Sequence, residues 1–311
     1  MKDKIILIGD GAVGSSYAFA LTLMGIGREL GIIDVNFNKA QGDAMDLSDA
    51  LSFTAPKSIY AANYEDCKDA TIVAITAGSP QKEGETRLQL VDKNIKIIKD
   101  IVERVVSTGF NGIFLIASNP VDIMTYATWK FSGFNANRVI GTGTALDSSR
   151  FRKEIAEVAN VDPRSVQAYI LGEHGDSEFP LWSHANIGGV PIDEYVRLNY
   201  INEHDLLNTF ENVRDAAYKI IDRKGATFYG IAAAMAKITQ AILNDENSIY
   251  SVSAYLRGEF GHDDIYIGVP AIINSNGIRK VLEIPLTDTE QERMDESVKT
   301  IKDITKKSLN K

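Results

Sequence analysis

Four short segments of the sequence place polar and charged side chains between apolar stretches: Thr76 to Arg87, Ser118 to Pro120, Leu146 to Arg152 and Gly172 to Asp176. The last segment contains His174 in a glycine-flanked turn after an apolar run. Histidine ionises close to neutral pH, so it can donate and accept a proton under working conditions. We therefore expect His174 to act in catalysis, and the other three histidines to be structural (His184, His204 and His262).

The segment Leu146 to Arg152 pairs a carboxylate with a guanidinium. Arg150 follows Asp147 by three residues, and a helix would place both side chains on one face. The planar guanidinium of arginine can bind a carboxylate through two parallel hydrogen bonds. The spacing predicts an anion-binding arginine beside an acidic residue. Two alternatives stay open, because an arginine often forms a surface ion pair and Asp147 near a helix start could be an N-cap.

The N-terminal segment Gly9-Asp10-Gly11-Ala12-Val13-Gly14 fits the pattern G-x-G-x-x-G between a predicted strand and a predicted helix. Such a loop lets the backbone approach a pyrophosphate at the helix N-terminus, where N–H groups point outward. Asp34 ends the next predicted strand, about 20 residues further on, where a carboxylate can accept hydrogen bonds from ribose hydroxyls. Its charge would repel the 2′-phosphate of NADP, which predicts NAD. The alternative is an exposed carboxylate at a strand end.

Apolar runs and helical patterns alternate through the first half of the chain. The predicted strands are 5–8, 31–34, a segment near 59, 71–76, 112–117 and 138–140. The predicted helices are 13–24, 38–48, 86–106 and 121–131. The strands are continuously apolar, which is typical of a parallel sheet covered on both faces. We expect an α/β fold with a Rossmann-type, doubly wound parallel sheet.

The second half has a different pattern. We expect helices at 146–160, 202–221, 227–243 and 287–307, a strand at 166–171, and a hairpin formed by 265–273 and 278–284. These elements predict a C-terminal α+β domain. We place the boundary near Thr144, giving domains 1–144 and 145–311.

Composition narrows the possible classes of protein. Hydrophobic residues make up 44% and charged residues 24% of the 311 residues, an ordinary balance for a soluble protein. No apolar run approaches the length of a membrane span, and Gly9 interrupts the first one too early for a secretion signal. The net charge of −9 argues against nucleic-acid binding. The single cysteine, Cys67, excludes an internal disulfide and a zinc site built on paired cysteines. We expect a cytoplasmic protein.

The motifs Gly-Glu-His-Gly-Asp at 172–176 and Leu-Asp-x-x-Arg-Phe-Arg at 146–152, together with the glycine loop, resemble the L-lactate dehydrogenase family of the lactate/malate dehydrogenase superfamily. The resemblance covers essentially the whole chain. It implies an NAD-binding Rossmann domain joined to a catalytic domain that reduces pyruvate to L-lactate with NADH. It also implies a small 2-keto or 2-hydroxy acid as substrate, no metal, a cytoplasmic homotetramer and a role in glycolysis and fermentation.

The resemblance assigns roles to individual residues. His174 is the proton donor, Asp147 binds it and favours its charged form, Arg150 anchors the substrate carboxylate, and Arg87 polarises the keto oxygen. Further substrate contacts are expected from Gln81, Asn119 and Thr227, although Thr227 could simply begin a helix. The expected cofactor contacts are Gly9, Gly11, Ala12, Val13, Gly14, Asp34, Thr76, Ala77, Gly78 and Asn119. The polar segment 79–84 suits a lid that closes over the substrate.

The position of Gln81 separates the main alternatives. Malate dehydrogenases resemble this sequence but carry an arginine there, whereas a neutral amide cannot pair with a second substrate carboxylate. A branched-chain 2-hydroxyacid dehydrogenase remains a further alternative, because the volume of the pocket cannot be read from the sequence. A nucleotide-binding protein without catalysis is disfavoured by the presence of His174, Asp147 and Arg150.

One regulatory feature of the family is incomplete in this sequence. Many bacterial relatives are activated by fructose 1,6-bisphosphate, which binds to two basic side chains of each subunit. Arg152 matches the first of them, whereas Gln167 stands where the family has a histidine. The resemblance therefore implies weak activation or none.

Overall fold

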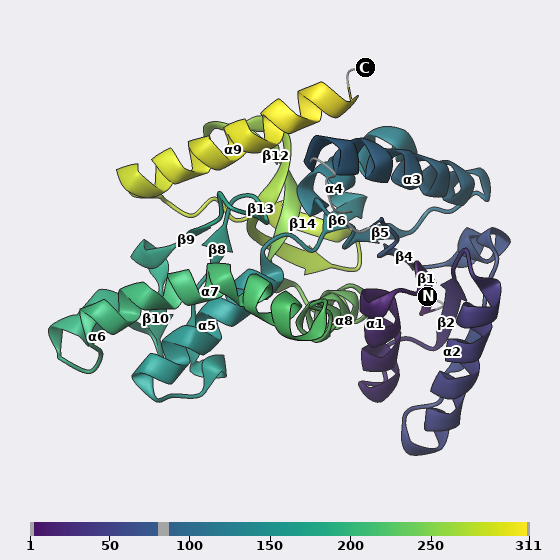
Figure 1. Ribbon diagram of the computed structural model, residues 1–311, viewed down its shortest axis with the longest axis horizontal. Helices are drawn as coiled ribbons and strands as arrows, with labels where there is room; N and C mark the ends of the chain where they lie inside the picture. Colours follow the sequence, from purple (N-terminus) through teal and green to yellow (C-terminus); the bar gives the residue numbers. More distant parts are fainter. Residues whose placement is uncertain (1–2, 80–86, 310–311) are drawn as a thin grey trace.

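The computed structural model describes residues 3–79 and 87–309 and places one large mixed sheet at the centre (Figure 1). Nine strands lie in the order β14-β13-β12-β6-β5-β4-β1-β2-β3. The parallel strands of the first half are β1 (Lys4–Ile8), β2 (Glu29–Ile33), β3 (Ser58–Ala61), β4 (Ile72–Ile75), β5 (Ile113–Ile116) and β6 (Val139–Gly141). Their order, 3-2-1-4-5-6, is that of the Rossmann fold, so the prediction of a doubly wound sheet is confirmed.

The central strands are buried along their whole length, as their continuous apolar sequences predict. β1, β4 and β5 carry no exposed residue, and Ile6 pairs with Gly31 on one side and with Val73 on the other. Helices α1 (Ala12–Leu23) and α2 (Phe37–Asp49) cover one face of the sheet, while α3 (Arg87–Ser107) and α4 (Val121–Ser132) cover the other (Figure 1). Because the parallel strands run in the same direction, their carboxyl ends lie at one edge of the sheet. The polar segments follow the strands at this edge.

The sheet continues into the second half of the chain through a strand that the sequence analysis missed. Strand β12 (Ser248–Arg257) joins β6 through the antiparallel pair Ser253 and Gly141. β12 also pairs along its length with β13 (Asp263–Asn274), which forms a hairpin with β14 (Gly277–Val281). The predicted hairpin is confirmed. Aromatic and β-branched residues in 248–257 were the available signal for the missed strand.

The single strand predicted at 166–171 is wrong. β7 (Val166–Gln167) pairs with β10 (Asn186–Ile187), which also pairs with β11 (Val190–Pro191), whereas β8 (Ile170–Leu171) pairs with β9 (Phe179–Pro180). The segment divides because β7 and β8 belong to different small sheets, with Ala168 and Tyr169 between them. The Ile170 carbonyl accepts hydrogen bonds from Thr144 Oγ1 (2.6 Å) and Ser251 Oγ (2.9 Å), and the Ile170 N–H donates to Ser148 Oγ (2.9 Å). These bonds from other elements hold the first residue of β8 in place.

The remaining helices pack around the sheet and against a second, smaller core. They are α5 (Ala145–Ala159), α6 (Ile192–Arg197), α7 (Glu203–Lys224), α8 (Tyr229–Leu243) and α9 (Asp288–Leu309). Short 3-10 helices occupy Ala50–Phe53, Tyr64–Asp69, Ala136–Arg138, Pro163–Ser165, Trp182–His184 and Glu259–Gly261. The smaller core lies under α5 and α7 and includes Phe151, Ile155 and Leu206.

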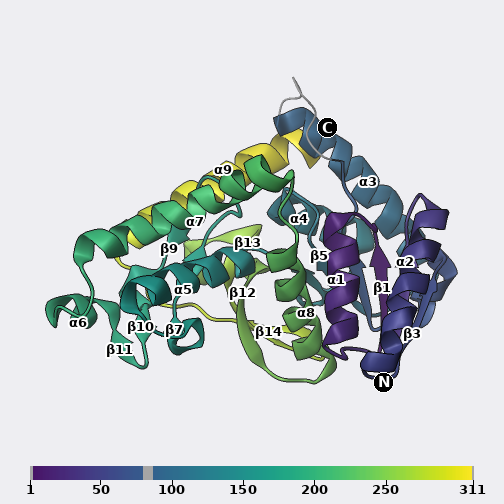
Figure 2. The ribbon, with the colours of Figure 1, turned by 60° about the horizontal axis from the view of Figure 1, so that its bottom comes forward.

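Helices α1 and α8 lie side by side and connect the two halves (Figure 2). The buried hydroxyls of Tyr17 and Thr239 share a hydrogen bond of 2.6 Å between them. Among the described residues, no helix combines the length and the apolar character needed to cross a bilayer.

Candidate active site

The three glycines of the N-terminal loop occupy different environments. Gly9 has φ +102°, and a Cβ added there would collide with the backbone of Ala77. A Cβ on Gly14 would overlap the carbonyl oxygen of Gly9, so this glycine lets α1 approach β1 closely. A Cβ on Gly11 would meet nothing within 4 Å, which leaves room for a ligand at the start of α1. Gly11 is also the N-cap and offers no side-chain hydrogen bond, so the first N–H groups of α1 suit a pyrophosphate.

Asp34 follows β2 and is held beside this loop. Its Oδ2 accepts a hydrogen bond from the Asp10 N–H (2.7 Å), and its Oδ1 accepts one from the Asn36 N–H (2.8 Å). A carboxylate oxygen can accept more than one hydrogen bond, so both oxygens can still bind ribose hydroxyls. The position of Asp34 therefore fits a cofactor with an unmodified ribose.

The segment after β4 closes the loop from the other side. Thr76 Oγ1 donates to the Gly9 carbonyl at 2.5 Å, and the Ala77 N–H donates to the Ile8 carbonyl at 3.1 Å. Asn94 of α3, which the sequence analysis missed, accepts a hydrogen bond from the Ser79 N–H (2.9 Å) and donates one to the Asn119 carbonyl (2.9 Å). Asn94 thereby joins the ends of β4 and β5. The sequence marks Asn94 only as a polar residue on an otherwise apolar face of the predicted helix.

Helix α5 presents the acidic and basic side chains of the second site. Its N-cap is Thr144, so the alternative that Asp147 is an N-cap is wrong. Asp147 lies in the first turn, where its Oδ2 is 2.6 Å from Nδ1 of His174 and its Oδ1 is 3.1 Å from Nη1 of Arg150. Nη2 of Arg150 also contacts Thr227 Oγ1 at 3.4 Å. The structure thus brings together four predicted site residues from three parts of the chain.

The charges of this cluster support one another. The negative charge of Asp147 raises the pKa of His174 to about 9, although burial of the imidazole acts in the opposite direction. Burial would raise the pKa of Asp147, but the nearby His174 and Arg150 outweigh it and keep this pKa below its usual range. A protonated imidazole bound to an ionised carboxylate is therefore the favoured state near neutral pH.

Two residues that the sequence analysis missed fix the backbone of His174. Asp122 of α4 accepts the His174 N–H with Oδ2 (3.0 Å) and the Ser253 hydroxyl with Oδ1 (2.6 Å). Burial raises the pKa of Asp122 to about 6. Its acidic side chain in an apolar helix pattern was a weak signal, and its partner Ser253 belongs to the missed strand.

The other predicted site residues are placed less completely. Asn119 lies exposed after β5, at a cis peptide bond to Pro120. Gln81 and most of the expected lid lie outside the described residues, as does the side chain of Arg87, whose backbone begins α3.

The two residues of the expected regulatory site lie on α5 and β7. Arg152 donates from Nε to the Ala168 carbonyl (2.9 Å), and its guanidinium lies 5.1 Å from the centre of the Tyr169 ring. Gln167 is exposed on β7. Arg152 thus already has protein partners in this structure.

Comparisons with known proteins agree over both halves of the chain. The family model of the lactate/malate dehydrogenase NAD binding domain matches residues 3–141, and that of the alpha/beta C-terminal domain matches residues 144–311. L-lactate dehydrogenase 1 of Enterococcus faecalis is 64% identical over 302 residues, which are 97% of this chain and 92% of the relative. The L-lactate dehydrogenase of Lacticaseibacillus casei is 63% identical over 302 residues, covering 97% and 93% of the two chains. The crystal structure of the minor L-lactate dehydrogenase of Enterococcus mundtii in its ligands-bound form superposes with a TM-score of 0.97, at 49% identity and 98% coverage of both chains.

Proposed function

The chain belongs to the lactate/malate dehydrogenase family, and we propose that within it the protein is an NAD-dependent L-lactate dehydrogenase that interconverts pyruvate and L-lactate. One observation supports this most directly: a buried carboxylate, Asp147, binds both a histidine at 2.6 Å and an arginine at 3.1 Å. The histidine can supply the proton and the arginine can bind the carboxylate of a 2-keto acid.

Each side chain of the cluster has one task in this proposal. NADH, when bound, supplies the hydride that reduces the keto carbon. Because Nδ1 of His174 is bound to Asp147, Nε2 is the nitrogen that delivers the proton to the keto oxygen. Arg150 has only 13% of its side chain exposed and is held by Asp147 and Thr227. Its other N–H groups can bind the substrate carboxylate and so fix which face of the carbonyl is reduced.

Three residues complete the proposed site on the basis of the family resemblance. Arg87 would stabilise the charge that develops on the keto oxygen, and Asn119 would lie between the nicotinamide and the substrate. Gln81 would face the substituent on the keto carbon. The position of Asn119 after β5, with its carbonyl bound by Asn94, supports its role.

Turnover with three 2-keto acids tests the proposal. NADH oxidation should be fastest, in kcat/KM, with pyruvate, and slower with oxaloacetate and with 2-ketoisocaproate. A preference for oxaloacetate would instead identify a malate dehydrogenase, and a preference for 2-ketoisocaproate a branched-chain 2-hydroxyacid dehydrogenase. Loss of turnover with all three acids would contradict the proposed reaction.

The cofactor preference should depend on Asp34. We expect kcat/KM with NADH to exceed that with NADPH by at least about tenfold. Repulsion between the 2′-phosphate and this carboxylate should cost about 1.4 kcal/mol or more of binding free energy. Asp34→Ser should narrow the ratio. Asp46→Ser, which removes an exposed carboxylate from α2, is the matched control and should leave the ratio unchanged. Equal kcat/KM for the two cofactors in the unmodified protein would refute the role of Asp34.

Substrate preference should depend on Gln81. We expect Gln81→Arg to shift kcat/KM from pyruvate toward oxaloacetate, because an arginine gains a charge-assisted pair with the second carboxylate, worth about 2 kcal/mol. With pyruvate, the same arginine has no partner. Gln81→Leu keeps a similar size without a charge and should give no gain with oxaloacetate. An unchanged ratio in Gln81→Arg would mean that Gln81 does not face the substrate.

Fructose 1,6-bisphosphate should activate the protein weakly or not at all. Gln167 carries no charge, so each phosphate loses one charge-assisted partner, and Arg152 is already bound to the Ala168 carbonyl and packed on the Tyr169 ring. We expect the KM for pyruvate near pH 7 to change less than tenfold when the ligand is added at millimolar concentration. Gln167→His restores a basic side chain and should increase the response. A fall of tenfold in the unmodified protein, or about 1.4 kcal/mol of coupling, would show that Gln167 does not disable the site.

We extend the proposal to the assembly, the location and the domain boundary. Large apolar side chains are exposed on and next to α2, among them Met45 (66%) and Phe53 (89%), which supports burial against another subunit. We propose that the protein is a cytoplasmic homotetramer. Light scattering would measure the mass of this assembly. We also propose that the NAD-binding domain ends near Thr144, where α5 begins.

A further inference from the structure

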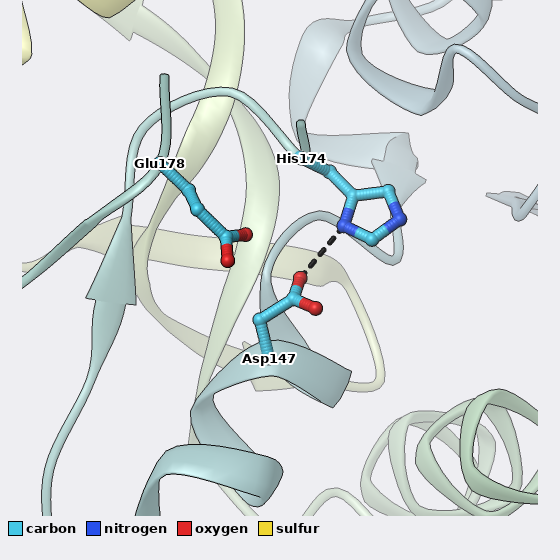
Figure 3. A group of neighbouring side chains, drawn as sticks. All are labelled: Asp147, His174 and Glu178. Carbon is cyan, nitrogen blue, oxygen red and sulfur yellow. Dashed lines mark hydrogen bonds and ion pairs between the residues drawn. The ribbon is translucent and has the colours of Figure 1, made fainter. Parts of the chain in front are cut away.

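Glu178 is a buried acidic residue that the proposed reaction does not yet use. It lies four residues after His174, and its N–H donates to the Gly175 carbonyl at 3.2 Å, which closes the turn before β9. Glu178 is only 9% exposed. Figure 3 shows the Glu178 carboxyl group directed toward Asp147, and one polar atom each of Glu178, Asp147 and His174 lie within 4.8 Å of one another.

The two carboxyl groups have unequal surroundings. Asp147 binds Arg150 through Oδ1 and His174 through Oδ2, so both of its oxygens are stabilised by a cation. Two buried carboxylates at this separation do not both ionise readily, because each charge opposes the other. Asp147 is therefore the ionised member, and Glu178 keeps its proton. Burial, followed by the negative charge of Asp147, raises the pKa of Glu178 to about 9, in agreement with this assignment.

The same three side chains are of types that can bind a metal ion. Here, however, Nδ1 of His174 and both oxygens of Asp147 are already joined in charge-assisted bonds. The Arg150 guanidinium, 3.1 Å from Asp147, would also repel a second cation. This arrangement of donors suits a retained proton better than a metal.

We propose that Glu178 is a positioning residue that works in its protonated form and thereby keeps the Asp147–His174 pair from holding the catalytic proton too tightly. A second negative charge beside His174 would stabilise the imidazolium and hinder proton transfer to the keto oxygen. A neutral Glu178 fills the same space without that charge. This inference rests on the proposed function, because it concerns the proton that His174 delivers.

Other charged groups around Glu178 and His174 act more weakly. They are Asp122 from α4, Asp176 from the same turn, Arg214 from α7, and Glu290 and Arg293 from α9. Glu178 shares a cavity of about 280 Å³ with the last four. The side chains of Arg214 and Arg293 are 49% and 62% exposed, so water screens their charges. Glu290 already accepts hydrogen bonds from Ser183 and Thr287.

Glu178→Gln separates charge from shape, because the amide resembles the neutral acid and cannot ionise. We expect kcat/KM for pyruvate at pH 7 to stay within about threefold of the unmodified protein. At alkaline pH, Glu178 of the unmodified protein ionises and helps His174 to retain its proton. Without that ionisation, the midpoint at which His174 loses its proton should move to lower pH by about half a unit or more.

Asp176→Asn is the matched control, since it removes a carboxylate from an exposed position of the same turn. The midpoint of His174 in this variant should coincide with that of the unmodified protein. An NMR titration of the His174 ring, in protein with isotopically labelled histidine and no substrate, gives a readout that does not depend on activity. The midpoint of His174 should be lower in Glu178→Gln and unchanged in Asp176→Asn.

Two results would overturn the inference. One is a loss of about tenfold or more at pH 7 in a folded Glu178→Gln protein, which would mean that the charged carboxylate is needed. The other is a His174 titration that coincides with that of the unmodified protein. If Glu178→Gln does not fold, the His174 titration of the unmodified protein provides the test. Coupling between Glu178 and His174 gives two steps, whereas a single step means that the two groups are not coupled and contradicts the inference. Absence of turnover with pyruvate would refute the proposed function instead, while the NMR titration would still test the coupling.

Discussion

His174→Asn is expected to lower kcat for pyruvate reduction by at least about a hundredfold, the low end of what general acid–base catalysis contributes. Asparagine can still hydrogen-bond to Asp147, but it has no group that transfers a proton near neutral pH. The affinity for NADH should remain nearly unchanged, because the proposed cofactor contacts lie at the glycine loop and at Asp34. Steady-state kinetics and a fluorescence titration with NADH measure the two effects separately.

His262→Asn is a matched control for this variant. His262 also binds a carboxylate, with Nε2 at 2.8 Å from Asp295 Oδ1, but this pair lies outside the proposed site. Its replacement should leave kcat close to that of the unmodified protein. The assignment of His174 fails if the His174→Asn protein retains more than about a hundredth of the original rate.

Asp147→Asn is expected to change both the rate of pyruvate reduction and its pH dependence. The charge of Asp147 holds the pKa of His174 near 9, and without it this pKa should return toward the ordinary value of about 6.5. Pyruvate reduction requires the protonated imidazole. The unmodified protein should therefore lose activity as the pH rises through about 9, and Asp147→Asn should lose it closer to neutral pH. At pH 8 the smaller protonated fraction alone predicts a loss of about thirtyfold.

Lactate oxidation should respond with the opposite sign, because it requires the neutral imidazole. Its rise with pH should begin at lower pH in Asp147→Asn than in the unmodified protein. Asp295→Asn, which removes the carboxylate partner of His262, should move neither profile. If the alkaline fall of pyruvate reduction stays in place in Asp147→Asn, then Asp147 does not control the proton of His174.

Much of the fold follows from patterns that are local in the sequence. The buried parallel strands could be predicted because a strand covered on both faces is apolar at every position, as in β1 and β4. The glycine loop could be predicted because its close contacts, Gly14 to Gly9 for example, lie within one turn of chain. The same locality placed Asp147 beside Arg150, three residues apart on α5.

The predictions failed where a strand takes its partners from far along the chain. Residues 166–171 read as one strand, but β7 pairs with β10 and β8 pairs with β9, so the segment divides between two sheets. Strand β12 was missed although its composition is suitable, since its place beside β6 depends on an antiparallel pair between Ser253 and Gly141. Hydrogen bonds between such distant residues leave no periodic trace in either segment.

Local sequence patterns suffice for the parallel sheet, for the glycine loop with Asp34 at the end of β2, and for the residue types needed for proton transfer and carboxylate binding. How those residues meet depends on the packing of distant elements. Asp147 and His174 are 27 positions apart, Asp122 and Ser253 are 131 apart, and their contacts exist because α4, α5, β8 and β12 pack together. The protonation state of Glu178 also depends on the tertiary structure, because it is set by the distance to a carboxylate on another element and by the exclusion of water. Spacing along a chain fixes neighbours within a turn or a helix, whereas charge and burial are set by neighbours in space.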